Sequence, residues 1–194
     1  MNIYKSNESQ EYSPVYLRKM RKKDYDLVVA WRNSDKVRRR FIYQEPFTVA
    51  GQEVWVRTMI DTGKAIQMMI CESDTNDPIG CVYLRDIDHL HLKAELGIFI
   101  GENKKRGKGY GTYAAKLMLE YGFHEMNLHR IFLRVLADNE VAIKSYQKAG
   151  FVQEGYLKDD VRINGFFNDI IWMAAVNPDE TDDGNEIADP RKPE

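Results

Sequence analysis

Apolar and polar residues alternate over several short stretches of the chain, a pattern that predicts β-strands. In the first half the strands are expected at 15–20, 65–71, 79–84 and 96–100. In the second half they are expected at 130–135, 152–157 and 168–176. The segment 74–78 and the pair Asn164-Gly165 are rich in turn-forming residues, so each separates two neighbouring strands.

Four other segments repeat apolar residues every three to four positions, which predicts helices. The first begins at Asp24 and ends near 33–34, and the second begins at Thr48, a plausible N-cap, and ends at Gly63. The third follows a glycine-rich stretch and runs through 114–121, and the fourth covers 140–148. Helices and strands together predict an α/β (α+β) fold without internal repeats.

The chain has 194 residues, of which 43% are hydrophobic, so it can bury one sizeable core and a single domain is expected. Its net charge of −2 is uneven. Residues 177–194 have seven acidic and two basic side chains, or −5, which leaves +3 for the rest. We therefore expect an N-terminal extension at 1–14, a domain at 15–176 and a disordered acidic tail at 177–194. A charge of +3 is too small to indicate nucleic-acid binding.

The chain has no run of 18 apolar residues and no apolar segment of a signal peptide at its start, so we expect a soluble cytoplasmic protein that does not bind membranes. Cys71 and Cys81 lie in strand-like segments, where small buried thiols are the expected interpretation. The four histidines lack metal-ligand spacing, and His89 and His91 are expected at the surface. No metal is expected.

A basic, glycine-rich loop at 104–112 joins the strand at 96–100 to the next helix. Glycines let a backbone approach a ligand closely, and the first N–H groups of a helix bind phosphate oxygens. The loop does not match a nucleotide P-loop, because Gly107-Lys108 is followed by Gly109 instead of Ser or Thr. A dinucleotide site matches only weakly, and a solvated surface turn is the simplest alternative. We expect a small ligand that carries phosphates.

A second motif, Asn139-Glu-Val-Ala-Ile-Lys-Ser-Tyr146-Gln-Lys-Ala-Gly150-Phe151, follows about 30 residues later. Together with Arg106-x-x-Gly109-x-Gly111, it resembles the coenzyme A motifs of the GNAT (Gcn5-related) N-acetyltransferase family, over about 15–176. The resemblance implies a mixed, mostly antiparallel twisted sheet of about seven strands flanked by four helices. It also implies acetyl-CoA as the acetyl donor, bound by Ile98, Phe99, Ile100, Arg106, Gly107, Lys108, Gly109, Tyr110, Gly111, Thr112, Asn139 and Ala142.

The resemblance gives two candidate catalytic residues. Tyr146 would face the sulfur and protonate the leaving thiolate; the alternative is a tyrosine that packs in the core. Glu95 would accept the amine proton; the alternative, equally weighted, is an ion pair with Arg85 or Lys93. A backbone N–H near Ile98 would stabilise the carbonyl oxygen. Asn139 would contact the pantetheine, cap the following helix, or do both.

The expected partner is a small-molecule amine, bound by Trp31, Arg32, Tyr43 and Glu45. The Ile163-Asn164-Gly165 loop resembles the polyamine (SpeG-like) branch, but that branch has acidic residues where this chain has Tyr43-Gln44 and Gln52. Trp31-Arg32-Asn33 and the nearby arginines resemble RimJ/RimL-like relatives.

An amino-sugar nucleotide or an amino acid or peptide end is therefore the expected acceptor, and a polyamine is the alternative. A module that binds acetyl-CoA without catalysis is a further alternative. The sequence leaves a homodimer or larger homo-oligomer open.

Overall fold

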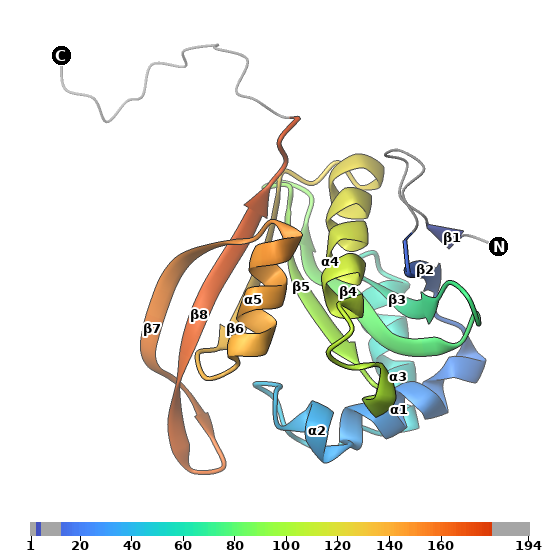
Figure 1. The fold of residues 1–194 in the computed structure, drawn as a ribbon, viewed down its shortest axis with the longest axis horizontal. Helices are drawn as coiled ribbons and strands as arrows, with labels where there is room; N and C mark the ends of the chain where they lie inside the picture. Colours follow the sequence, from blue (N-terminus) through green and yellow to red (C-terminus); the bar gives the residue numbers. More distant parts are fainter. Residues whose placement is uncertain (1–2, 5–12, 180–194) are drawn as a thin grey trace.

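Eight strands form one mixed sheet in the computed structural model, which describes residues 3–4 and 13–179 (Figure 1). Their order across the sheet is β1-β2-β3-β4-β5-β6-β8-β7. The strands are β1 (Ile3–Tyr4), β2 (Val15–Lys19), β3 (Ala65–Glu72), β4 (Pro78–Asp88), β5 (Lys93–Ile100), β6 (Arg130–Leu136), β7 (Val152–Ile163) and β8 (Phe166–Val176). The predicted mostly antiparallel sheet is confirmed, and the short β1 adds an eighth strand.

The β5 and β6 strands form the parallel pair of this sheet, and they stay together over a short distance. They pair at Lys93↔Arg130, Ala94↔Ile131 and Glu95↔Phe132. On its other edge β5 pairs with β4 as far as Gly80↔Ile100. After Glu95 the edge of β5 that faces β6 therefore has no strand partner, and the sheet opens into a fork. The backbone groups along this open edge need another hydrogen-bond partner.

Five α-helices connect or flank the strands: α1 (Tyr25–Asn33), α2 (Asp35–Arg38), α3 (Val49–Trp55), α4 (Tyr110–Glu120) and α5 (Glu140–Ala149). Wider helical turns extend α3 through Val56–Ile60 and α4 through Tyr121–Glu125, and short turns lie at Lys22–Asp24 and Asn103–Lys105. Thr48 accepts a hydrogen bond from the Gly51 N–H (3.0 Å), which confirms the predicted cap. The sequence did not predict α2, because four residues cannot show a helical repeat.

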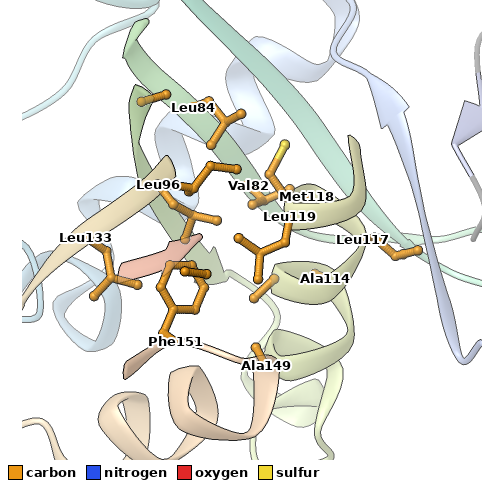
Figure 2. Packing of buried hydrophobic residues seen from close by; sticks show 14 of the residues in the cluster. Val82, Leu84, Leu96, Ala114, Leu117, Met118, Leu119, Leu133, Ala149 and Phe151 are labelled. Carbon is orange, nitrogen blue, oxygen red and sulfur yellow. The ribbon is translucent and has the colours of Figure 1, made fainter. Parts of the chain in front are cut away.

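One core lies between the sheet and the pair α4 and α5, which cover the same face (Figures 1 and 2). Alternate strand residues such as Val82, Leu84 and Leu96 meet Met118 on α4 and Phe151 just after α5 (Figure 2). Val82, Leu84 and Met118 are completely buried. Each such large side chain contributes about 1.5–3 kcal/mol by leaving water.

A second core lies on the opposite face, against α1. The intervening strand residues, including Met69 and Phe99, contact Val28 and Trp31 there. The indole of Trp31 meets Phe99 edge to face at 6.5 Å and donates a hydrogen bond to Glu102 (2.9 Å). The two-residue alternation of the strands thus gives each face of the sheet its own layer.

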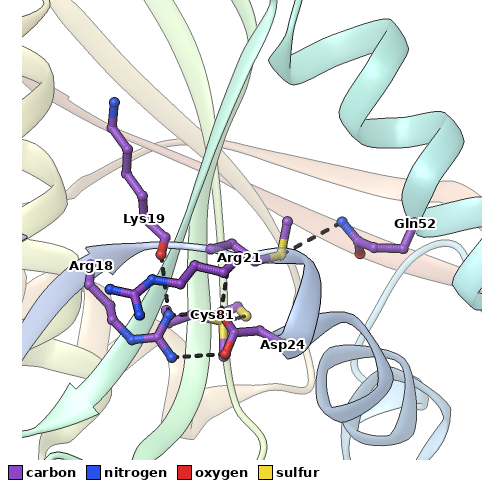
Figure 3. Close-up of polar contacts among 8 residues, drawn as sticks. Arg18, Lys19, Arg21, Asp24, Gln52 and Cys81 are labelled. Carbon is purple, nitrogen blue, oxygen red and sulfur yellow. Dashed lines mark hydrogen bonds and ion pairs between the residues drawn. The ribbon is translucent and has the colours of Figure 1, made fainter. Parts of the chain in front are cut away.

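The start of α1 is fixed by a buried ion pair (Figure 3). Arg18 on β2 donates two hydrogen bonds to Asp24, at 2.7 and 2.9 Å, and the Arg21 N–H donates a third at 2.8 Å. These donors lower the pKa of Asp24 although burial acts to raise it. The contact anchors α1 to the sheet, and α1 in turn positions Arg32.

The β7–β8 hairpin extends beyond the body of the sheet (Figure 1). Both strands run up to the turn at Asn164-Gly165, so they are longer than predicted. Both turn residues have positive φ, 49° and 89°, as a tight two-residue hairpin turn requires.

Most of the predicted acidic tail, 180–194, and residues 1–2 and 5–12 of the expected extension lie outside the described residues. Within the described part, no helix is long and apolar enough to span a membrane. No group of His, Cys, Asp and Glu there is arranged to hold a metal ion.

Candidate active site

A cavity of about 630 Å³ lies at the fork between β5 and β6. It is lined by α1, α2 and the loop that follows on one side, and by the glycine loop, α4 and α5 on the other. The predicted ligand residues of β5, Ile98, Phe99 and Ile100, all line it. The cavity therefore reaches the open edge of β5, where an extended amide-containing ligand would find hydrogen-bond partners.

The glycine loop forms one end of the cavity. Gly107 and Gly109 have φ of 75° and 82°, values that favour glycine, and the Gly109 conformation starts α4. The N–H groups of Gly107, Lys108 and Gly109 have no acceptor among the described residues. Free amides and a helix N-terminus fit the phosphates of coenzyme A. Gly107, Gly109, Tyr110, Gly111 and Thr112 line the cavity, whereas Lys108 is exposed and does not.

A buried carboxylate holds this loop from behind. Glu72, at the end of β3, accepts hydrogen bonds from Lys105 and the Tyr110 hydroxyl, both at 2.6 Å, and from Thr75 at 3.0 Å. These partners, Lys105 first, lower the pKa of Glu72 to about 2. Lys105 and Tyr110 are thus fixed by a contact between segments more than 30 residues apart.

Arg106 connects the loop to two other elements. Its side chain donates to the Ile100 carbonyl of β5 (3.0 Å) and to the Lys36 carbonyl of α2 (3.1 Å). It lines the cavity, but these bonds turn it toward the protein backbone. The sequence assigned it to the ligand, and the structure gives it a bracing role as well.

Tyr146, Asn139 and Ala142 line the cavity from α5. The ring of Tyr146 meets Phe151 edge to face at 5.8 Å, and its hydroxyl has no hydrogen-bond partner among the described residues. Burial, and to a smaller extent the nearby Tyr83, raises the pKa of Tyr146 above the usual value for a tyrosine. Asn139 occupies the N-cap position of α5, but its side chain makes no capping bond and is free for a ligand.

Tyr83 lines the same cavity as Tyr146 and lies close enough to influence its pKa. Its ring lies over Gly97 on β5, where a Cβ would be 2.2 Å from the ring, and it meets Trp55 of α3 edge to face at 6.4 Å. Burial raises its pKa. Two protonated phenols therefore reach the same opening from opposite faces.

Glu95 sits where β5 and β6 separate. It accepts hydrogen bonds from Arg85 on β4 (2.8 Å) and from two nitrogens of Arg134 on β6 (3.0 and 3.2 Å). The ion pair with Arg85 was one of the predicted roles, and the ion pair with Arg134 was not anticipated. Within the described part of the chain, Lys93 makes no ion pair with Glu95. Both carboxylate oxygens are occupied, which favours the ion-pair role over that of a general base.

Two of the four predicted acceptor residues line the cavity. Arg32 and Tyr43 line it, but Trp31 belongs to the second core and Glu45 is exposed to solvent. Trp31 packs on Gly101, whose Cβ would lie 2.1 Å from the indole. The repeat of apolar residues in the sequence identifies the apolar face of α1. It does not reveal whether this face contacts the sheet or a substrate.

The position that is acidic in the polyamine branch is neutral and buried here. Gln52 on α3 is 1% exposed, donates to Gln67 (3.2 Å) and contacts the Met20 sulfur (3.8 Å) (Figure 3). Gln44 bonds to the Arg39 carbonyl and accepts from Asn164, so the hairpin tip does meet the loop before α3. Gln52 lines the cavity and Gln44 does not, so the one amide of these two that reaches the cavity carries no charge.

The sequence did not assign Tyr83, Arg85 or Arg134 to the site, although all three line the cavity. Gly97 was the available signal, because a glycine inside a strand indicates close approach by another group.

The chain matches the family model described as acetyltransferase (GNAT) domain over residues 15–152. It is 34% identical to spermidine N(1)-acetyltransferase of Escherichia coli (strain K12) over 161 residues, which is 82% of this chain and 84% of that protein. It is also 30% identical over 97 residues to the putative ribosomal N-acetyltransferase YdaF of Bacillus subtilis (strain 168), covering 50% and 52% of the two chains.

A solved structure of spermidine N-acetyltransferase from Vibrio cholerae in complex with CoA and spermine has the same fold. The TM-score is 0.79 at 27% identity, and the match covers 86% of this chain and 97% of that one.

Proposed function

The chain belongs to the GNAT family of acetyltransferases, and on that premise we propose how its cavity moves an acetyl group from acetyl-CoA to a primary amine. The observation that carries the proposal is the fork. At the fork, the open edge of β5, the free N–H groups of the glycine loop and the Tyr146 hydroxyl all border one cavity. The free amides of the glycine loop would hold the phosphates, and the open edge of β5 would pair with the pantetheine.

The reaction joins the amine nitrogen to the thioester carbonyl carbon and breaks the bond from that carbon to sulfur. A backbone N–H near Ile98 would donate to the carbonyl oxygen as it gains charge. Tyr146 would give its hydroxyl proton to the leaving thiolate, whose pKa is roughly 8.5 by comparison with a cysteine thiol. The raised pKa of Tyr146 keeps the donor protonated at neutral pH.

The amine must lose a proton before it attacks. The acceptor end is strongly cationic, because Arg32, Arg40, Arg85 and Arg134 line it and Glu95 is its one carboxylate among the described residues. Positive neighbours disfavour an ammonium ion and lower its pKa. We therefore assign deprotonation to this environment and to solvent, and Glu95 to positioning the two arginines at the fork.

The same charge pattern bears on the acceptor. A polyamine carries two or more ammonium groups, and burying each costs several kcal/mol unless a carboxylate pairs with it. Among the described residues, Glu95 is the carboxylate that the cavity offers, and two arginines already bind it. We propose an acceptor in which the part of the molecule that carries the reacting amine is neutral or anionic. An amino-sugar nucleotide, an amino acid and a peptide end are examples.

Spermidine or spermine is the second candidate. It is favoured by the 34% identity with the E. coli spermidine N(1)-acetyltransferase across most of both chains.

Thiol release from acetyl-CoA separates the candidates when spermidine, spermine, amino acids and a UDP-linked amino sugar are assayed side by side. Efficient turnover, at kcat/KM above about 10⁴ M⁻¹s⁻¹, identifies the physiological class. Efficient turnover of spermidine would overturn the charge argument. Absence of turnover with every amine, despite tight acetyl-CoA binding, would favour a module without catalysis.

A further inference from the structure

Arg32 is an arginine of the cavity wall for which the described residues supply no carboxylate partner. It lies at the end of α1, and its Nη1 atom is buried without a hydrogen-bond acceptor in the described part of the chain. A buried donor without a partner costs about 1–3 kcal/mol, and more when it is charged. Because so costly a group persists in the wall of the cavity, a ligand atom that accepts its hydrogen bonds is the natural explanation.

The neighbouring arginines are already paired. Arg85 and Arg134 share Glu95, and Arg40 binds Asp138 at 3.1 Å. Arg38 binds Asp35 and does not line the cavity. Among the arginines that line this end, Arg32 is therefore the one that no carboxylate of the described residues pairs with.

Two aromatic rings hold the Arg32 guanidinium in place. Its carbon lies 3.5 Å from the centroid of Phe41 and 5.7 Å from that of Phe47. The loop with these rings is tied back to α1, because Asn33 donates to the Phe47 carbonyl (2.7 Å) and accepts from the Phe47 N–H (2.8 Å). A guanidinium stacked on a ring keeps the N–H groups in its own plane for other partners.

The position of Arg32 indicates which ligand it meets. Its electrostatic neighbours are Tyr83 and Arg85, both on β4 and on the α1 face of the sheet. The glycine loop and α5 approach from the other face. Arg32 therefore belongs to the acceptor end of the cavity, near Tyr83.

We infer that Arg32, stacked on Phe41, binds an oxyanion of the acceptor, a carboxylate or a phosphate close to the amine that is acetylated. This inference rests on the proposed function. It adds the residue that would distinguish anionic acceptors from neutral and cationic ones. Guanidinium binds both oxyanions through paired hydrogen bonds, and its fork geometry matches their oxygens. A second ammonium group at this position would face an uncompensated guanidinium, so the same residue would disfavour polyamines.

The test compares amines that differ in the oxyanion. Serine with serinamide tests a carboxylate, and glucosamine 6-phosphate with glucosamine tests a phosphate. The protein should prefer the anionic member of at least one pair by 10-fold or more in kcat/KM. Arg32→Met keeps the apolar stem without the charge and should bring that preference, the ratio of kcat/KM between the two members of a pair, close to 1. Arg32→Lys should retain part of the preference.

Arg38→Met is the matched control, because it removes an arginine six positions away that does not line the cavity. It should leave the preference unchanged, and acetyl-CoA affinity should be the same in all variants. If the arginine variants do not fold, Phe41→Leu removes the stacking partner and should reduce the preference.

Calorimetric titration of the protein–CoA complex with serine, serinamide and the two sugars reads the same preference without catalysis. Failure of acetyl transfer is thus distinguished from failure of the oxyanion site. Equal use and equal binding of both members of each pair, or a preference that survives Arg32→Met, would overturn the inference.

Discussion

Tyr83 occupies the space above Gly97: a side chain on that glycine would put its Cβ 2.2 Å from the tyrosine ring. The pair lies in the fork, where β5 faces both the donor and the acceptor. Gly97→Ala should therefore displace the ring and reshape the acceptor end. We expect kcat/KM to fall by about 10²-fold, the size typical of a 1 Å displacement in an active site.

Gly155→Ala is a control for this substitution, because Gly155 also lies in a strand and its added Cβ would meet Trp172 at an ordinary 3.9 Å. Steady-state kinetics on both variants give the answer. An active Gly97→Ala protein would mean that Tyr83 can move without consequence for the reaction.

Gly109 lies in the glycine loop directly before α4 with φ of 82°, and Gly109→Val should both strain the loop and block the proposed phosphate site. We expect acetyl-CoA affinity to fall by at least 10-fold in calorimetry while the domain remains folded. Gly63→Val imposes a similar strain at φ of 73° in the turn before β3. It should lower stability without changing acetyl-CoA binding, and unchanged affinity in Gly109→Val would refute the assigned loop.

Tyr146→Phe removes a hydroxyl that has no partner within the described part of the chain. As a proton donor to the thiolate, that hydroxyl should contribute roughly 10² to 10⁴ in kcat. Acetyl-CoA affinity should change little, because the ring keeps its contact with Phe151. Tyr113→Phe alters an exposed tyrosine of α4 and should have no effect. A normal kcat in Tyr146→Phe would leave Tyr146 with a packing role.

Glu95→Gln tests the two roles of this residue against each other. It leaves Arg85 and Arg134 without their charge partner at a largely buried position. The free energy of unfolding should fall by about 2–4 kcal/mol, somewhat less than for a completely buried pair. The pH dependence of kcat should keep its shape. Loss of an acidic limb from the pH profile, with stability intact, would instead identify Glu95 as the base.

Glu72 should make stability depend on pH in the acid range. Lys105, Tyr110 and Thr75 hold its folded-state pKa at about 2, below the ordinary value of 4.5. The stabilisation is therefore complete above about pH 4.5 and is lost as the pH falls from there toward 2. Glu72→Gln lacks this contribution. Denaturant unfolding measures the difference in free energy of unfolding between the unmodified protein and Glu72→Gln. This difference should be constant near neutral pH and shrink below pH 4.5. A difference that stays constant down to pH 2.5 would contradict the prediction.

Local patterns were sufficient for the parts of the site that are contiguous in the chain. The strand, glycine loop and helix at 96–121 were all predicted, because periodicity and glycine spacing are properties of neighbouring residues. The extent of β7 was underestimated, because the polar run 158–160 interrupts its apolar pattern at the place where its register with β8 shifts. The short α2 was missed for lack of length.

The acceptor end depends on contacts between distant segments. Arg134 and Glu95 are 39 positions apart, and their pairing follows from the register of β5 and β6. The burial of Trp31 depends on how α1 rotates against the sheet. The aromatic stacking that fixes Arg32 depends on a loop with no periodicity of its own. Physical packing determines all three, and composition or spacing does not reveal it.

The open edge of β5 also bears on edge-to-edge pairing between sheets of different molecules. An unpaired strand edge is a template for another chain, and proteins commonly protect such edges with covering elements. Here the open edge lies inside the sheet, between β5 and β6, and it borders the cavity instead of the rim of the sheet. We expect acetyl-CoA, a slender chain with its own amides, to pair with this edge. A feature that would promote aggregation at the rim of a sheet would then serve ligand binding.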